Sequence, residues 1–386
     1  PELAPDAMAA VTLAERLGSM PILGGNDVEL MTQTEDVIDR LIADVDAAEH
    51  HVHLLFYIFA NDETGRRVAE ALGRAVARGV KCRLLVDSVG SARMLKRLAP
   101  KMLARGVELH ESLPVGILRR RAARIDMRNH RKLAVIDGRI AYTGSQNIVN
   151  ANYGHKNLAW HDMMARLTGP AVLELQAVFV SDWSFDTGEI LDGDGVFPDP
   201  PVAGNIPVQI LPSGPSYPTE NYQRMVVAAL HAARQHVIIT TPYFVPDEPF
   251  MQALEVAVLR GVEVELIVPQ RTDRWLVAAA SRAYYSAVLD AGVKLHLYHE
   301  GLLHSKTMTI DRALAFLGTG NFDIRSFALN FEVNLLLYDA DVTERLRAEQ
   351  QRYIDDSVAM APAEWHKRPR VQKVVENIAK LLSPLL

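Results

Sequence analysis

The stretch NHRKLAVIDGRIAYTGSQN at residues 129–147 is matched in pattern by LHSKTMTIDRALAFLGTGN at residues 303–321. Histidine, lysine, aspartate, a hydroxyl residue and asparagine stand at the same offsets in both copies. A lone His-x-Lys carries almost no information, but two complete copies indicate a duplicated site. The shared positions are His130, Lys132, Asp137, Ser145 and Asn147 in the first copy and His304, Lys306, Asp311, Thr319 and Asn321 in the second.

The spacing explains how these residues can meet. A histidine and a lysine two residues apart on a strand project from the same face. In each copy a second apolar run, residues 139–143 or 313–317, follows a turn and returns the hydroxyl and the asparagine beside the lysine. A cation with neutral donors beside a potential nucleophile suits a phosphate oxyanion. Asp137 and Asp311 fall at the turns, where aspartate often bonds the local backbone, so a structural role competes with a catalytic one.

Helices and strands alternate around each copy of the motif. In the first half we expect helices at residues 35–49, 65–78 and 91–105 and strands at 52–59, 81–86 and 107–110. In the second half we expect helices at 220–235, 248–260 and 273–291 and strands at 237–241, 264–268 and 293–297. Buried strands between helices predict the α/β class, with two similar α/β/α sandwich domains related by a pseudo-twofold axis.

The domain boundaries follow from this repeat. A segment rich in proline, glycine and aspartate separates the halves and is expected to be a linker with one strand at residues 208–211. The predicted organisation is a membrane-proximal segment (1–34), a first domain (35–185), the linker (186–218), a second domain (219–366) and an amphipathic, membrane-associated tail (367–386).

Composition excludes several classes of protein. The chain has 386 residues, enough for two complete cores, and its net charge of −6 argues against a protein built to coat nucleic acid. The single cysteine, Cys82, rules out an internal disulfide and a cysteine zinc site, and its strand-like surroundings predict a buried side chain. No apolar stretch approaches the ~20 residues needed to span a bilayer.

These motifs resemble those of the phospholipase D superfamily, whose hallmark is the duplicated HxKx4D motif with a following GSxN. The similarity to bacterial cardiolipin synthases is closer and extends over essentially the whole chain. Thr319 departs from the usual serine but keeps the hydroxyl. The stretches that carry the similarity, besides the two motifs, are HVHLLFYIF, TTPYFVPDE, GTGNFDIRSFALNFE and the final LSPLL.

The resemblance implies a reaction through a phosphohistidine, without a metal or another cofactor. It implies His130 as the nucleophile and His304 as the general acid, although the internal symmetry leaves the reverse order open. An acidic residue about 30 positions after each histidine orients its imidazole in the superfamily, and Asp162 and Glu332 stand at those positions. The groups expected to bind the phosphate are Lys132, Lys306, Ser145, Asn147, Thr319 and Asn321.

Two segments suggest contact with a membrane. Residues 370–382 have apolar side chains at helical spacing among several basic ones, which is typical of an interfacial helix on anionic lipid, although packing on the domain is equally compatible. Residues 113–124 combine an apolar tip with four arginines just before the first motif. The resemblance implies phosphatidylglycerol as the substrate, two upstream membrane-spanning helices beyond this chain, and catalytic domains on the cytoplasmic side of the bacterial inner membrane.

Other functions remain possible on this scaffold. A phospholipase D that transfers the phosphatidyl group to water, or a phosphodiesterase acting on nucleic acid, would use the same motifs. The acidic balance and the amphipathic tail disfavour the nuclease, and we expect no nucleic-acid partner. A non-catalytic lipid-binding module is disfavoured because both motif copies are intact. The sequence makes no prediction of the oligomeric state.

Overall fold

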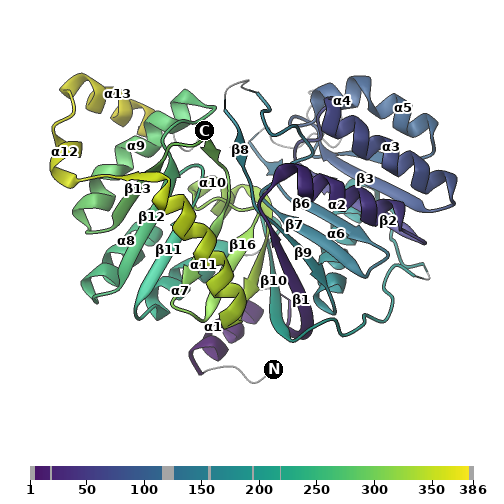
Figure 1. The fold of residues 1–386 in the computed structure, drawn as a ribbon, viewed down its shortest axis with the longest axis horizontal. Helices are drawn as coiled ribbons and strands as arrows, with labels where there is room; N and C mark the ends of the chain where they lie inside the picture. Colours follow the sequence, from purple (N-terminus) through teal and green to yellow (C-terminus); the bar gives the residue numbers. More distant parts are fainter. Residues whose placement is uncertain are drawn as a thin grey trace.

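A mixed β-sheet runs through both halves of the chain. The structure is a computed structural model that describes residues 5–17, 20–114, 126–154, 158–193, 195–217 and 219–381. Within these residues 16 strands belong to one sheet, and helices cover both of its faces (Figure 1). The α/β class and the two similar halves are confirmed.

The elements follow the predicted alternation in both halves. The elements up to residue 187 are α1 (Pro5–Arg16), β1 (Leu23–Met31), α2 (Thr34–Asp46), β2 (His51–Phe56), α3 (Glu63–Ala77), β3 (Lys81–Asp87), α4 (Ala92–Arg97), α5 (Ala99–Ala104), β4 (Glu108–Ser112), β5 (Arg128–Asn129), β6 (Lys132–Ile136), β7 (Ile140–Gly144), β8 (Trp160–His161), β9 (Met164–Thr168) and α6 (Ala171–Thr187). The later elements are β10 (Ile206–Ser213), α7 (Asn221–Ala232), β11 (His236–Thr240), α8 (Glu248–Leu259), β12 (Glu263–Pro269), α9 (Trp275–Asp290), β13 (Lys294–Tyr298), β14 (Leu302–Leu303), β15 (Thr307–Ile310), β16 (Leu314–Gly318), α10 (Ile324–Ala328), β17 (Asn330–Leu337), α11 (Ala340–Asp355), β18 (Ser357–Ala359), α12 (Pro362–His366) and α13 (Arg370–Leu381).

The strand pairing repeats between the halves. In the first half β2, β3 and β4 run parallel, and β6, β7 and β9 continue the sheet in antiparallel order from β2. In the second half β11, β12 and β13 run parallel, and β15, β16 and β17 continue in antiparallel order from β11. Both motifs therefore lie on equivalent antiparallel hairpins, β6–β7 and β15–β16.

The centre of the sheet comes from segments predicted to be peripheral. Strand β10 pairs with both β1 and β17, and β1 also pairs with β9, so these two strands join the halves. The prediction of one strand at 208–211 within a linker was therefore too short, and residues 1–34 contribute a sheet strand rather than a separate segment. Every residue of β10 is buried because the strand is covered on both faces.

Three hydrophobic clusters stabilise this arrangement. One packs under the outer helices of the second half and one under those of the first half. The third draws on both halves, burying Leu133 and Leu335 with side chains of α6 and α11. Cys82 is buried, as predicted. Because the third cluster is shared, the two halves are held to each other by apolar packing as well as by the sheet.

A few local predictions need correction or lie outside the described residues. The single helix expected at 91–105 is two short helices, α4 and α5, separated at Leu98, with Pro100 in the first turn of α5 where its missing N–H is tolerated. Residues 115–124 of the predicted basic segment are not among those that the structure describes. Among the described residues, no helix is both long enough and apolar enough to cross a membrane.

Asp137 and Asp311 hold matching turns at the far ends of the two motif hairpins. Both adopt a left-handed backbone, with φ of 53° and 49°. The Asp137 carboxylate accepts backbone N–H bonds of 2.8–2.9 Å from residues 49–51, and Asp311 accepts bonds of 2.8–3.0 Å from residues 234–236. These contacts tie each hairpin to the start of β2 or β11. Of the two roles that the sequence left open for these aspartates, the contacts favour the structural one over the catalytic one.

Replacing Asp137 with alanine should lower the free energy of unfolding by about 2–4 kcal/mol, because three backbone donors lose a charged acceptor. Urea denaturation followed by circular dichroism measures this change. Glu255→Ala, at an exposed position on α8, is the control and should change stability by less than about 0.5 kcal/mol. Equal stability of the Asp137 variant and the wild type would contradict the structural assignment.

Candidate active site

Short strands exchanged between the halves place the two motif histidines. Strand β5, just before His130, pairs with β17 of the second half, and the His130 amide donates to the Phe331 carbonyl at 2.9 Å. In the same way β14, just before His304, pairs with β8 of the first half, and the His304 amide donates to the His161 carbonyl at 2.8 Å. Each histidine is therefore anchored on the opposite half of the molecule.

The orienting carboxylates also come from the opposite half. His130 Nδ1 lies 3.0 Å from both carboxylate oxygens of Glu332, and His304 Nδ1 lies 2.6 Å from Asp162 Oδ1. The expectation that each acidic residue orients the histidine that precedes it in the sequence is wrong, because the pairs are crossed. A carboxylate on Nδ1 fixes the tautomer with a proton there, which leaves Nε2 available as a base or nucleophile.

The hydroxyl residues of the motifs bind these carboxylates. Ser145 Oγ donates to Asp162 at 2.6 Å, and Thr319 Oγ1 donates to Glu332 at 2.6 Å. Each hydroxyl also accepts a backbone N–H at 2.9 Å. The hydroxyls thus stand behind the carboxylates and do not line the cavity described below, contrary to their predicted phosphate contact. A threonine satisfies this role as well as a serine because only the hydroxyl is used.

Two buried lysines lie beside the histidines. Nζ of Lys132 donates to the His130 carbonyl at 2.6 Å, and Nζ of Lys306 donates to the His304 carbonyl at 2.5 Å. Burial lowers the pKa of Lys132 to about 8, and burial with repulsion from Lys132 lowers the pKa of Lys306 to about 7. Burial disfavours the charged forms of these lysines. An anion bound near them would stabilise those charged forms and offset the effect of burial.

The same burial keeps the imidazoles neutral. It lowers the pKa of His130 and of His304 to about 4, although the facing carboxylates act in the opposite direction. For Glu332 and Asp162, burial acts to raise the pKa, but the neighbouring histidine, lysine and hydroxyl groups together hold it below the ordinary value. At neutral pH, without a bound anion, the site therefore contains neutral imidazoles beside ionised carboxylates.

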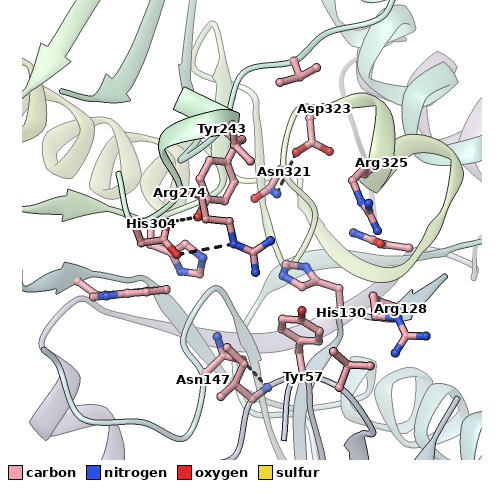
Figure 2. Close-up of a pocket in the computed structure, with 18 of the residues that line it drawn as sticks. Tyr57, Arg128, His130, Asn147, Tyr243, Arg274, His304, Asn321, Asp323 and Arg325 are labelled. Carbon is pink, nitrogen blue, oxygen red and sulfur yellow. Dashed lines mark hydrogen bonds and ion pairs between the residues drawn. The ribbon is translucent and has the colours of Figure 1, made fainter. Parts of the chain in front are cut away.

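A cavity of about 530 Å³ opens over the two histidines (Figure 2). Asn147 and Asn321 line it, whereas Lys132 and Lys306 lie behind the histidines and do not. Asn147 accepts a bond from the Ile58 amide at 3.0 Å through its oxygen, which leaves its NH₂ group for a ligand. The other lining residues are Tyr57, Ile58, Val89, Gly90, Arg128, Tyr153, Trp160, Tyr243, Val245, Asp273, Arg274, Val277, Asp323, Ile324, Arg325 and Asn330.

Comparison with known proteins agrees with this geometry. Residues 41–183 and 226–354 match the family described as "Cardiolipin synthase, PLD-like domain". The chain belongs to the cardiolipin synthases of the phospholipase D superfamily. It is 38% identical to the cardiolipin synthases A of Edwardsiella ictaluri and Yersinia pestis, over 97% of this chain and 78% of each relative. The enzyme is thus a phosphatidyltransferase of that superfamily.

Solved structures share the fold of this cardiolipin synthase. The phosphatidylserine synthase of Haemophilus influenzae superposes over 98% of this chain and 100% of its own, with a TM-score of 0.72 and 16% identity. The polyphosphate kinase of Porphyromonas gingivalis superposes over 93% of this chain and 54% of its own, with a TM-score of 0.58 and 16% identity. At this identity the likeness concerns the fold alone.

Several lining residues of the synthase were missed by sequence analysis. Tyr57 and Tyr243 begin the related segments YIFAND and YFVPDE, so the repeat itself could have identified them. Trp160 packs edge-on against His304 with ring centroids 4.6 Å apart. The arginines of the cavity carry no such signal, because they lie outside the repeated motif positions.

One group with metal-ligand spacing lies elsewhere in the synthase. Among the residues that the structure describes, His236, Glu263 and Glu265 bring ligand atoms within 4.8 Å of one another, a cluster that sequence spacing did not reveal. His236 and Glu263 begin β11 and β12, and none of the three lines the cavity. Glu265 bonds His236 at 2.8 Å and His296 at 2.7 Å, which gives these side chains partners without an ion.

Double-mutant cycles should verify the crossed pairs. His130→Ala combined with Glu332→Gln should show a coupling free energy of about 1–3 kcal/mol in unfolding experiments, because the two side chains are in contact. His304→Ala with Asp162→Asn should behave alike. The own-half combination of His130→Ala with Asp162→Asn is the control and should be additive within about 0.5 kcal/mol. Stronger coupling in the own-half combination would contradict the crossed arrangement.

Proposed function

We propose that the enzyme transfers a phosphatidyl group from one phosphatidylglycerol to another, forming cardiolipin and releasing glycerol. The observation that supports this most is the pair of histidines, each bonded through Nδ1 to a carboxylate and both facing one cavity. Two such histidines suit a reaction in which a phosphate is transferred first to the enzyme and then to the acceptor. Relatives that match nearly the whole chain carry the name cardiolipin synthase A.

In the first step, Nε2 of His130 attacks the phosphorus of the donor lipid. A nitrogen–phosphorus bond forms, the bond to the glycerol oxygen breaks, and protonated His304 gives its proton to that oxygen. The low pKa that burial gives His304 does not prevent this, because a bound anionic phosphodiester favours the imidazolium. The two histidines have equivalent partners, and we retain the order that the family resemblance implies.

In the second step, the acceptor replaces the released glycerol. Neutral His304 removes the proton from the acceptor hydroxyl, whose oxygen attacks the phosphorus as the nitrogen–phosphorus bond breaks. Lys132 and Lys306 supply positive charge behind the phosphate, and the Asn147 amide can donate to its oxygens. These groups serve in place of a metal ion, so we propose that the reaction needs neither a metal nor a cofactor.

Helix α13 provides a surface for an anionic membrane. Glu376 and Ala379 face the protein, where Glu376 forms ion pairs of 3.2 Å with Arg282 of α9 and 3.1 Å with Arg368. Large apolar side chains on the rest of the helix, 47–80% exposed, are Val371, Val374, Val375, Ile378 and Leu381. Basic residues around this stripe would meet lipid headgroups.

The position of α13 links this surface to the cavity. The helix packs along α9, whose N-terminal end carries the 73% exposed Trp275 next to the cavity residue Arg274 (Figure 1). A tryptophan at this place suits the boundary between membrane and water. One face of α13 packs on α9 while its apolar stripe stays exposed, so packing on the domain is compatible with the proposed contact with lipid. We propose that the enzyme acts on the cytoplasmic side of the bacterial inner membrane.

The decisive assay uses vesicles of phosphatidylglycerol alone, with a metal chelator present. The wild type should form cardiolipin and glycerol in equal amounts. His130→Ala should abolish a labelled covalent phosphatidyl-enzyme, and His304→Ala should slow both its formation and its breakdown by roughly 10²–10⁴.

Other products would point to other functions. Phosphatidic acid as the main product would make the enzyme a hydrolase, and a strict need for phosphatidylethanolamine would show a different donor. A labelled adduct in the His130 variant but never in the His304 variant would reverse the two roles. The metal-free mechanism would be contradicted if a chelator abolished activity and one divalent ion restored it, provided that the ion does not act by bridging lipids.

Charges on the apolar stripe of α13 should weaken membrane binding. Val374→Asp with Ile378→Asp should lower cosedimentation with phosphatidylglycerol vesicles roughly 10-fold or more, because two apolar side chains no longer enter the interface. Turnover of monomeric short-chain lipid should fall much less. Val202→Asp, at a 78% exposed apolar position far from α13 in sequence, is the matched control. Unchanged cosedimentation of the double variant would refute the role of α13.

A further inference from the structure

Basic residues make the cavity asymmetric. Arg128 stands two positions before His130, where the second copy has Leu302, and Arg325 stands four positions after Asn321, where the first copy has Ala151 after Asn147. The groups around the reacting phosphate are duplicated, whereas these two arginines are not. Arg128 and Arg325 therefore add positive charge at one end of the cavity beyond what the duplicated site supplies, and Arg274, which is also outside the repeated motif positions, lines the cavity as well.

The two arginines belong to one corner of the cavity. Nη2 of Arg325 donates to the carbonyl of Asp126 at 2.7 Å, two residues before Arg128. Arg128 in turn pairs with Asn330 in the register of β5 and β17, and all three side chains Arg128, Arg325 and Asn330 line the cavity. Figure 2 shows Arg128 and Arg325 at one end and His304 at the other.

The two arginines of this corner differ in their ion pairs. Arg128 has an ion pair with Asp87 at 3.4 Å, whereas Arg325 contacts no carboxylate among the residues that the structure describes. The nearby Asp323 carboxylate, which also lines the cavity, accepts bonds from the Ser326 backbone amide at 2.8 Å and from Nδ2 of the Asn321 side chain at 3.0 Å. The Arg325 guanidinium is thus available to an anion in the cavity.

Asn330 adds an independent feature. Its side chain is only 7% exposed, and its Oδ1 has no hydrogen-bond partner. The orientation of the amide is fixed, because Nδ2 donates to Glu332 Oε1 at 3.2 Å and a carboxylate can only accept. A buried acceptor without a donor is destabilising, and a ligand hydroxyl would relieve this cost once a small shift of the Asn330 side chain opens Oδ1 to the cavity that the residue lines.

We propose that Arg325, Arg128 and Asn330 form the binding subsite for the acceptor lipid. The guanidinium groups bind its phosphodiester, and Asn330 Oδ1 accepts a bond from a hydroxyl of its glycerol headgroup. The other hydroxyl of that headgroup then extends to the phosphorus on the side of His304, which removes its proton. The inference rests on the proposed function and adds to it the reason why a lipid is used in preference to water or a neutral alcohol. The headgroup of phosphatidylglycerol fits this subsite because it has a phosphodiester and a glycerol hydroxyl only a few bonds apart.

The test compares two acceptors in one reaction. The full chain acts on phosphatidylglycerol vesicles with ethanol added, and the ratio of cardiolipin to phosphatidylethanol is measured. Arg325→Gln should lower this ratio roughly 10- to 100-fold, because one charged contact to the acceptor is lost. Arg325→Lys should give an intermediate ratio, since it keeps the charge without the planar fork. Arg312→Gln, at an 81% exposed side chain, should leave the ratio unchanged.

A measurement on the wild type supports the same conclusion without a variant. Added glycerol 3-phosphate, which carries a phosphate and glycerol hydroxyls in soluble form, should lower the ratio by competing for the subsite. An equal effect on both products would overturn the inference. This competition also covers the case in which the Arg325 variant does not fold.

The remaining outcomes separate the alternatives. An unchanged ratio in Arg325→Gln, or an equal loss of both products, would overturn the subsite and leave Arg325 a structural residue. A loss of vesicle cosedimentation, with a normal ratio on short-chain lipid, would show that Arg325 binds the membrane surface instead, which also overturns the subsite. A wild type that forms phosphatidylethanol but no cardiolipin would instead overturn the proposed function itself.

Discussion

The exchange of carboxylates between the two halves is the constraint on which the rest of the structure depends. Glu332 bonds His130, and Asp162 bonds His304, so neither half contains a complete set of catalytic groups. A buried carboxylate without its partner is costly, and each of these also accepts a motif hydroxyl. The halves must therefore be fixed relative to each other to within the tolerance of a hydrogen bond.

The architecture meets this requirement in several ways. Strands β1 and β10 make one sheet of the two halves, and β5 and β8 cross to pair with β17 and β14. A shared apolar core lies beneath α6 and α11. Because this frame excludes water from the floor of the site, it also lowers the pKa of the histidines and of the lysines. Burial thus makes the charged forms of these histidines and lysines unfavourable, and a bound phosphate would reduce that cost.

The repeated and the unrepeated residues of the site have different roles. The repeated residues form a nearly symmetric centre suited to one phosphate, in which either histidine could face either alcohol. Departures from the repeat lie at the edge of this centre, in Arg325 and Arg128 at one end of the cavity, and at the surface, in the exposed stripe of α13. The duplicated groups provide the chemistry. The unrepeated residues around them can select the acceptor and orient the enzyme on a membrane.

The sequence by itself determined the α/β class, the repeat and the identity of the residues around the histidines, because these depend on local periodicity and on spacing along one hairpin. It placed His130 beside Lys132 since a strand puts alternate residues on one face. It could not show that Glu332 serves His130 or that β10 is central, because those facts depend on how segments far apart in the chain pack together. It also could not show that Ser145 and Thr319 bind carboxylates, because that depends on how each motif hairpin packs against the strand that follows it. The cavity arginines and Asn330 became visible only when β5 was placed against β17, since no motif marks residues that meet through tertiary contact alone.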